Sequence, residues 1–262
     1  MTAAVSRAVT EEPRTLRLMG VRVTDVGFDS AVARLAAGLE HPRRRALYFV
    51  NAHTLNLAAR DTGFRDVLNR ADVVFGDGTG VRWAARARGL RLRANLNGTD
   101  LVPALLDARP GTRVFLLGST AERIGKAAEA FRARFPDCEL VGVHHGYLQD
   151  APASRAVVAG INAARPEVLL VGMGNPLQER WIDRWRGELD APLCIAVGGL
   201  LEYWTGALDR APSWMRRAGV EWVHIMLRQP WKAGRYLAGN PAFIARLLLW
   251  LPADLKRSPA LG

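Results

Sequence analysis

A single aspartate stands between two glycines at the end of an apolar run, in residues 71–80 (ADVVFGDGTG). β-Branched and aromatic residues at 73–75 predict a short strand, and a helix-like sequence follows. Parallel strands of open α/β sheets place ligands at their carboxyl ends, and the flanking glycines leave room for a substrate beside Asp77. On this segment alone, a helix N-cap explains Asp77 at least as well as an acid that binds or activates a ligand.

Polar and small residues follow the other predicted strands in the same way. Taken singly, each of these sites is more often a tight turn or a helix cap, and capping accounts for Glu179. Together they converge on one edge of a sheet, which suits a polyhydroxylated or phosphorylated ligand. Besides Asp77, the strand-end candidates are Asn51, His53, Thr79, Gly118, Ser119, Gly172, Asn175 and Gln178.

Regular alternation of apolar runs and helical patterns positions these residues. Buried strands are predicted at 46–50, 73–75, 113–117, 140–143, 168–171 and 193–197, and an edge hairpin or strand pair at 16–26. Helical patterns lie between most of them. The alternation predicts an α/β fold with a mostly parallel sheet and helices on both faces.

The composition of the chain indicates which kinds of binding partner and which location to expect. The 262 residues carry 36 Lys and Arg against 25 Asp and Glu, a net charge of +11, which favours anionic partners. No apolar stretch reaches the roughly 20 residues that span a bilayer, and the polar N-terminus lacks the apolar region of a signal peptide. We therefore expect a cytoplasmic protein, with attachment to a membrane surface left open.

The chain divides by composition into a disordered tail (1–15), an α/β core (16–210) and a helical, basic appendage (211–262). The appendage carries eight Lys and Arg against two acids, and it is rich in tryptophan. Amphipathic helices packed on the core, binding at a membrane interface and binding to nucleic acid all fit this pattern. The strongly apolar run 240–251 favours the membrane over nucleic acid.

Seven sequence blocks, in this order and spacing, resemble the WecG/TagA/CpsF family of bacterial glycosyltransferases (glycosyltransferase family 26). The resemblance extends roughly from Met19 to Phe243, and the series as a whole is highly specific. The blocks are 51–54 (NAHT), 71–80 (ADVVFGDGTG), 97–101 (NGTDL), 115–119 (FLLGS), 171–179 (VGMGNPLQE), 210–215 (RAPSWM) and 219–222 (GVEW).

The resemblance implies a Rossmann-like core and an inverting transfer from a UDP-sugar to a polyprenyl-diphosphate-linked saccharide. The sugar would be a hexose or N-acetylhexosamine, such as N-acetylmannosamine, its uronic acid or glucose. The product would enter teichoic acid, enterobacterial common antigen, capsule or exopolysaccharide. The resemblance also implies no metal or other cofactor, no nucleic acid, and a peripheral position on the cytoplasmic face of an anionic membrane, where the appendage helps to complete the site.

Carried over by position, Asp77 matches the general base of the family, which takes the proton of the attacking acceptor hydroxyl. Asn51 and Gln178 match positions that line the pocket. Departure of UDP without a metal requires helix N-termini and arginines. Candidates for that role are the Gly118-Ser119 turn and Arg210, Arg216, Arg217, Arg228 and Arg235, while His53, Thr79, Arg93, Asn95, Gly172, Asn175 and Glu202 complete the predicted substrate-binding set.

Two departures from the family pattern concern the donor. Asn95 stands where many relatives have an arginine, with Arg93 two residues earlier, and Glu202 stands where relatives often have Asp. A nucleotide- or nucleic-acid-binding module is the alternative function, because the C-terminal segment is basic. An NAD-dependent enzyme is disfavoured, because the turn at 172–174 lacks the third glycine and the later acid of a dinucleotide fingerprint. A homo-oligomer is compatible with the sequence, which does not define the assembly.

Overall fold

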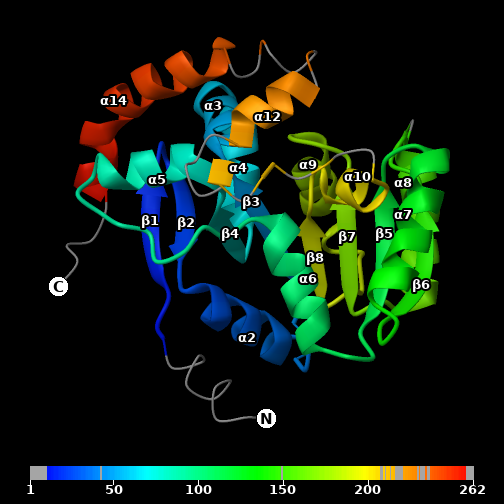
Figure 1. The fold of residues 1–262 in the computed structure, drawn as a ribbon. Helices are drawn as coiled ribbons and strands as arrows, with labels where there is room; N and C mark the ends of the chain where they lie inside the picture. The colour runs from blue at the N-terminus through cyan, green and yellow to red at the C-terminus, as the bar shows by residue number, and fades with distance from the viewer. Residues whose placement is uncertain are drawn as a thin grey trace.

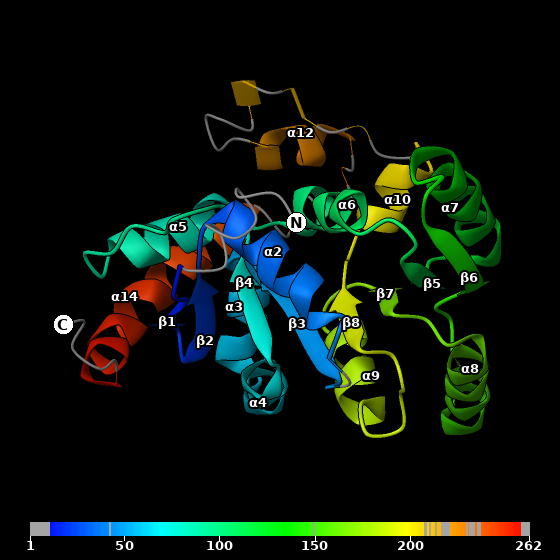
Figure 2. The same cartoon turned by 90° about the horizontal axis from the view of Figure 1, so that it is seen from below.

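The computed structural model describes residues 11–41, 43–148 and 150–206, and in the C-terminal part residues 209, 211, 212, 214, 215, 221–228, 230, 234 and 237–257. Within this part of the chain, one eight-stranded sheet runs through the molecule and helices cover both of its faces (Figures 1 and 2). The predicted α/β fold with a mostly parallel sheet is confirmed.

The strands follow the predicted apolar runs closely. Their order across the sheet is β1-β2-β4-β3-β8-β7-β5-β6, with β1 antiparallel to β2 and every other pair parallel. The strands are β1 (Arg14–Leu18), β2 (Val21–Asp25), β3 (Arg45–Val50), β4 (Val73–Gly76), β5 (Arg113–Gly118), β6 (Glu139–His144), β7 (Val168–Gly172) and β8 (Leu193–Ala196).

Two helical layers enclose the sheet, as expected where buried parallel strands present apolar side chains on both faces. The helices of one layer are α3 (Ala52–Arg60), α4 (Thr62–Arg70), α5 (Gly78–Arg86), α8 (Ala151–Ala164), α9 (Leu177–Trp185) and α14 (Gly239–Arg257). Those of the other are α2 (Phe28–Gly38), α6 (Gly98–Ala108), α7 (Ala121–Arg134) and α10 (Leu200–Trp204). The layers have separate hydrophobic clusters.

The chain ends differ from simple tails. Strand β1 begins at Arg14, inside the range assigned to the disordered tail, because Arg14 pairs with Asp25 across the hairpin. Residues 1–10 lie outside the described part. At the other end, the helices α12 (Glu221–Arg228) and α14 agree with the predicted helical C-terminal segment. No helix among the described residues is long and apolar enough to cross a membrane.

Helix α14 returns to the core and packs beside α3 and the β1–β2 hairpin (Figure 1). Phe243 and Leu247 on its inner face are buried in the same cluster as the α3 side chains. The buried carboxylate of Asp254 accepts the backbone N–H groups of Met19 (2.6 Å) and Gly20 (3.0 Å) in the hairpin turn. These contacts fix both ends of α14 to the core.

Candidate active site

A cavity of about 580 Å³ lies at the carboxyl ends of the parallel strands, where open α/β sheets bind their ligands. The turns after β3, β4, β5, β6, β7 and β8 all contribute to it, and several helices begin at its wall. Eight predicted site residues line it: Asn51, His53, Asp77, Ser119, Gly172, Asn175, Gln178 and Glu202.

Asp77 follows β4 directly and occupies the N-cap position of α5, but its carboxylate makes no capping hydrogen bond to that helix. The capping explanation for Asp77 is therefore wrong for this structure. The backbone holds the turn instead: Asp77 N–H donates to the Val50 carbonyl (2.8 Å), and Gly78 N–H donates to Asn95 Oδ1 (2.6 Å). Gly78 has a φ of +85°, which suits a residue without a Cβ.

Asn95 thus acts on the Asp77 turn from outside the cavity, since it is not among the lining residues. Its side-chain oxygen satisfies the N–H of the residue next to Asp77. An arginine at this position would offer only donors and no acceptor for that N–H. The asparagine that departs from the family pattern therefore stabilises the Asp77 turn through its side-chain amide oxygen.

Asn51 combines two roles at the end of β3. Its Oδ1 caps α3 by accepting from the backbone N–H groups of His53 (3.0 Å) and Thr54 (3.1 Å). Capping uses only the side-chain oxygen of Asn51, so its side-chain NH2 group takes no part in the capping interaction. Because Asn51 also lines the cavity, it can both start α3 and offer a hydrogen-bond donor to a ligand.

The β5 turn requires glycine for a steric reason. A Cβ on Gly118 would lie 2.3 Å from the Gly172 carbonyl oxygen, and Gly118 has a φ of +153°. Gly118 itself is absent from the lining, so it serves the site by letting β5 and β7 end side by side. Ser119 follows with a φ of +55°, unusual for a residue other than glycine, and donates its N–H to the Gly172 carbonyl (3.1 Å).

Gln178 ties two cavity turns together. Its Oε1 accepts the N–H groups of Gly174 (3.2 Å) and Gly198 (3.0 Å), which follow β7 and β8. Its Nε2 donates to Glu179 Oε1 (2.8 Å), and only 2% of the residue is exposed. Gln178 therefore shapes the wall of the cavity, rather than offering a free amide to a ligand.

Glu179 lies in the first turn of α9, behind the cavity. It is fully buried, and its Oε1 also accepts a hydrogen bond from the Asn175 side-chain amide, whereas Oε2 is buried without a hydrogen-bond partner among the residues that the structure describes. Burial raises its pKa to about 7, against the lowering effect of the Gln178 and Asn175 hydrogen bonds. Asn175 and Gln178 thus share one buried acceptor behind the cavity.

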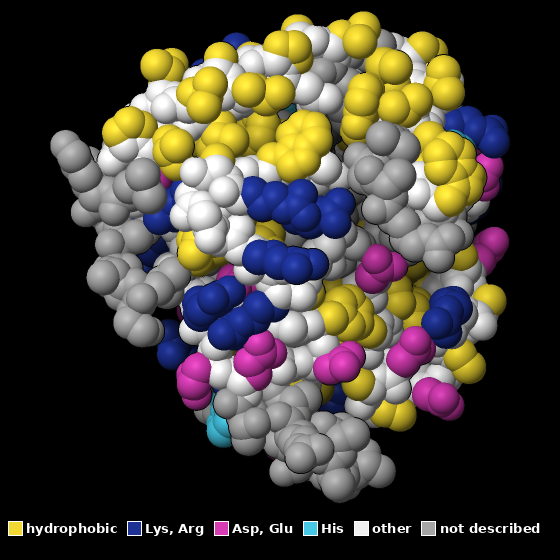
Figure 3. Space-filling view, turned by 60° about the vertical axis from the view of Figure 1, so that its left-hand side comes forward, with side chains coloured by type: hydrophobic (Ala, Val, Ile, Leu, Met, Phe, Trp, Pro, Cys, Tyr) yellow, Lys and Arg dark blue, Asp and Glu magenta, His cyan; other side chains and the backbone are white. Residues whose placement is uncertain are grey.

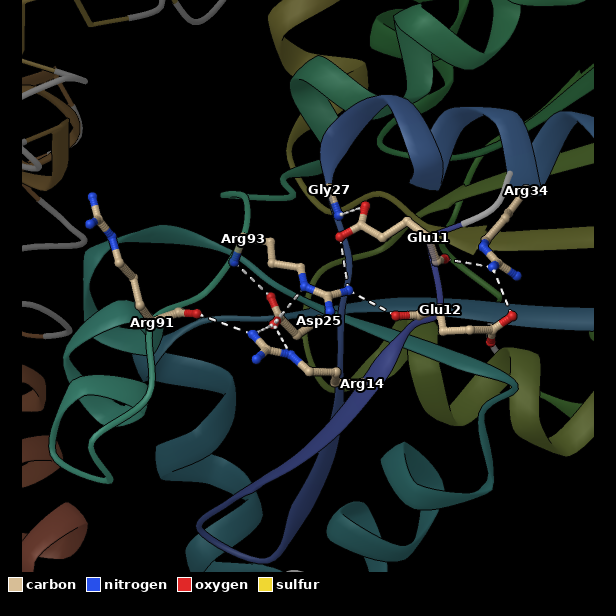
Figure 4. A network of polar contacts seen from close by, with 8 residues as sticks. All are labelled: Glu11, Glu12, Arg14, Asp25, Gly27, Arg34, Arg91 and Arg93. Atoms are coloured by element: carbon tan, nitrogen blue, oxygen red, sulfur yellow. Dashed lines mark hydrogen bonds and ion pairs between the residues drawn. The ribbon is translucent and has the colours of Figure 1, made fainter. Parts of the chain in front are cut away.

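Arg93 lies away from the cavity, in a polar network between the N-terminal strands and the loop after α5 (Figure 4). Its backbone N–H donates to Asp25 (2.8 Å), and its guanidinium pairs with Glu11 (2.8 Å). Glu11 in turn accepts the Gly27 N–H (3.0 Å), a hydrogen bond that lowers the pKa of Glu11. The charge of Arg93 is thus used in holding the N-terminal segment to the core.

The remaining predicted residues lie apart from the cavity or cannot be placed. Thr79 is outside the lining, and its hydroxyl accepts from Arg82 (3.2 Å). Arg228 on α12 pairs with Asp209 (3.5 Å) and does not line the cavity. Arg210, Arg216, Arg217 and Arg235 lie outside the described residues.

Several lining residues were not predicted. Arg123, in the first turn of α7, pairs with Glu202 on α10 (3.3 Å). Tyr147 follows β6, and Glu221 and Ile225 come from α12, so the C-terminal segment reaches the cavity. The position of Arg123 four residues after the strand-end serine was the available signal, but the orientation of its side chain was not evident from the sequence.

The arrangement provides a carboxylate, amides, hydroxyls and helix N-termini at one sheet edge, a combination suited to proton transfer beside a bound anion. Among the described residues, no group of three or more His, Cys, Asp or Glu side chains is placed to hold a metal ion. Independence from metal stays a prediction. The sheet and cavity define the protein as an open α/β protein with a polar ligand site at its strand ends.

Comparison with known proteins gives the family. The family model for glycosyl transferases of the WecG/TagA/CpsF family matches residues 16–257, nearly the whole chain. The chain belongs to this family and is a glycosyltransferase, as the sequence blocks indicated. Neither a nucleic-acid module nor an NAD-dependent enzyme accounts for a match of this length.

Two bacterial relatives are similar over most of their length. One is the N-acetylglucosaminyldiphosphoundecaprenol N-acetyl-beta-D-mannosaminyltransferase of Bacillus subtilis (strain 168), 31% identical over 192 residues, which are 72% of this chain and 73% of the relative. Another has the same name in Staphylococcus aureus (strain MW2) and is 31% identical over 199 residues, 75% of this chain and 77% of the relative.

Proposed function

We propose that this glycosyltransferase moves a sugar from a UDP-sugar to a polyprenyl-diphosphate-linked saccharide, with inversion at the anomeric carbon. N-Acetylmannosamine is the first candidate for the donor sugar, and undecaprenyl-diphosphate-linked N-acetylglucosamine for the acceptor, because the relatives are named for that pair. The observation that carries the proposal is the placement of Asp77 in the strand-end cavity without a capping role in α5.

In this proposal Asp77 acts as the general base. Its carboxylate takes the proton of the acceptor hydroxyl, whose oxygen attacks the anomeric carbon of the donor. The bond between that carbon and the diphosphate oxygen breaks, and UDP leaves with the bonding electrons. Asn51 and the turns held by Gln178 orient the two substrates, so the attacking oxygen meets the sugar from the face opposite UDP.

The experiment uses the full-length protein, kept in EDTA, with a short-chain prenyl-diphosphate N-acetylglucosamine and a panel of UDP-hexoses. We expect UDP release that needs both substrates and is fastest with UDP-N-acetylmannosamine. Reactions without acceptor control for donor hydrolysis. Absence of turnover with every donor would contradict the proposed transfer, while turnover only after addition of a divalent metal would contradict the proposed independence from metal.

We also propose that the face carrying α12 and α14 binds the surface of an anionic membrane. Figure 3 shows hydrophobic side chains gathered along the upper edge, where α12 and α14 lie in Figure 1, with a band of Lys and Arg below. On α14 the exposed side chains include Ile244, Leu248 and Leu249, and on α12 Leu227. Apolar side chains above a basic band are typical of interfacial binding, and they would bring the cavity to a lipid-linked acceptor.

A further inference from the structure

The described lining of the cavity carries an excess of negative charge. Asp77, Glu202 and Glu221 contribute carboxylates, and Arg123 is the sole Lys or Arg among the described lining residues. A UDP-sugar brings a diphosphate with further negative charge into this space. Binding it needs at least one well-placed cation, since like charges a few ångströms apart repel strongly in a partly enclosed site.

The position of Arg123 does not serve the stability of its own helix. It lies in the first turn of α7, where the helix dipole favours anions and disfavours cations. That turn is already capped, because Thr120 Oγ1 accepts the Arg123 backbone N–H (3.2 Å). An arginine in this position is therefore explained better by what its side chain meets in the cavity.

The protein partner of Arg123 is weakly held. Its guanidinium lies 3.3 Å from Glu202 across the gap between α7 and α10, and the two side chains are 52% and 31% exposed. Ion pairs with this exposure contribute little to stability, whereas a guanidinium binds phosphate oxygens through two parallel hydrogen bonds. The pair can open at little energetic cost when a stronger anion enters.

We propose that Arg123 binds the diphosphate of the nucleotide donor and gives up its ion pair with Glu202 to do so. The inference rests on the proposed function, in which the donor is a UDP-sugar. Asn95, where many relatives have an arginine, supplies no cation and uses its side-chain oxygen to hold the Asp77 turn. Glu202 neutralises Arg123 in the empty cavity and is released when the nucleotide binds.

Titration calorimetry of the full-length protein with UDP and with uridine tests this. The dissociation constant of uridine divided by that of UDP measures the preference for UDP. This ratio isolates the contribution of the diphosphate, because contacts to the nucleoside cancel. For Arg123→Gln we expect unchanged uridine affinity and roughly a tenfold to hundredfold loss of the preference for UDP, the effect of one hydrogen-bonded charge. Glu202→Gln should raise the preference, since it frees Arg123. Arg123→Lys should fall between, because it keeps the charge and loses the planar fork.

Lys126→Gln is the matched control. It removes one positive charge from the same helix, where Lys126 pairs with Glu122 outside the cavity lining, and it should leave the ratio unchanged. A ratio for Arg123→Gln equal to that of Lys126→Gln would overturn the inference and leave the proposed function standing. A lower ratio for Glu202→Gln than for wild type would overturn the proposal that Arg123 exchanges Glu202 for the diphosphate. Wild-type protein that binds neither UDP nor a UDP-sugar would instead remove the proposed function.

Discussion

The turn that carries Asp77 is held at the backbone, where the Asp77 N–H donates to Val50 and the Gly78 N–H donates to Asn95, and the Asp77 side chain makes no capping hydrogen bond to the following helix. Such a turn can present an acid to a substrate without losing the helix behind it. A substitution that keeps the shape of Asp77 should therefore keep the backbone hydrogen bonds of this turn and the start of α5, and its main effect should be on the chemistry.

For Asp77→Asn we expect kcat to fall by about a hundredfold or more, the usual contribution of a general base, while the affinity for UDP changes little. The amide matches the carboxylate in size but cannot accept the proton of the acceptor hydroxyl. Initial rates of UDP release at saturating donor and acceptor, beside UDP binding by calorimetry, measure the two quantities. Full retention of kcat would exclude Asp77 as the base.

Glu179 gives the protein a pH-dependent stability with a defined sign. Burial raises its pKa from 4.5 to about 7, so between these values the folded protein holds a proton that the unfolded chain has released. The free energy of unfolding therefore falls as the pH rises through this window, by up to about 3 kcal/mol, and this contribution is constant above it. Glu179→Gln cannot ionise and keeps an oxygen to accept from Asn175 and Gln178.

We expect urea unfolding to show Glu179→Gln gaining stability relative to wild type between about pH 5 and pH 8, by the amount that wild type loses. Glu188→Gln is a suitable control, because Glu188 forms a surface ion pair with Arg155. A difference between Glu179→Gln and wild type that stays constant with pH would show that the Glu179 carboxyl does not titrate in this range.

At the residue scale the sequence predicted which strand ends carry polar groups, but not how each group is used. The glycines and polar residues that follow apolar runs indicated Asn51, Asp77 and Ser119 as lining residues. Arg93 lies away from the cavity and Arg123 lines it, because each pairs with a residue that is distant in the sequence. Asp25 draws Arg93 into an ion-pair network, and Glu202 holds Arg123 at the cavity.

At the scale of elements, strands were predictable because each buried strand is a short apolar run closed by glycine or polar residues. The interior of β5 consists of Val, Phe and Leu and that of β7 of Val and Leu, and neither run is long enough for a typical helix. The order of the strands was not predictable, since it depends on which helix crosses which face. Nor was the docking of α14, which depends on single polar contacts with residues about 190 to 235 positions away.

Asp254 should control that docking. Its carboxylate satisfies two buried N–H groups in the β1–β2 turn, and leaving them unpaired costs about 1–3 kcal/mol each. For Asp254→Ala we expect faster amide hydrogen exchange and proteolysis in α14, with the central strands remaining protected. Asp107→Ala, which removes an exposed ion pair with Arg134, should leave α14 unchanged. Equal loss of protection in α14 and the core would contradict a local role.

The whole molecule places its strand-end cavity and its exposed apolar helices on neighbouring sides, with α12 contributing to both. An enzyme whose acceptor is anchored in lipid needs this arrangement, because the reacting sugar lies close to the membrane surface. Deleting the chain from Ala211 onward would test membrane binding only coarsely. It would also uncover the α3 surface that Phe243 and Leu247 cover, so aggregation could mask the result.

Substitutions on the outer face of α14 give the sharper test. Leu248 and Leu249 are 63% and 79% exposed, so Leu248→Ser/Leu249→Ser should leave the melting temperature nearly unchanged. The double variant removes apolar area that enters the bilayer interface, which should weaken membrane binding by about 1 kcal/mol or more for each side chain. We expect several-fold weaker flotation with anionic vesicles, and weak binding of all forms to zwitterionic vesicles. Val143→Ser, on the distant edge strand β6, should float like wild type. Equal flotation of the double variant and wild type would mean that α14 is not the membrane-binding element.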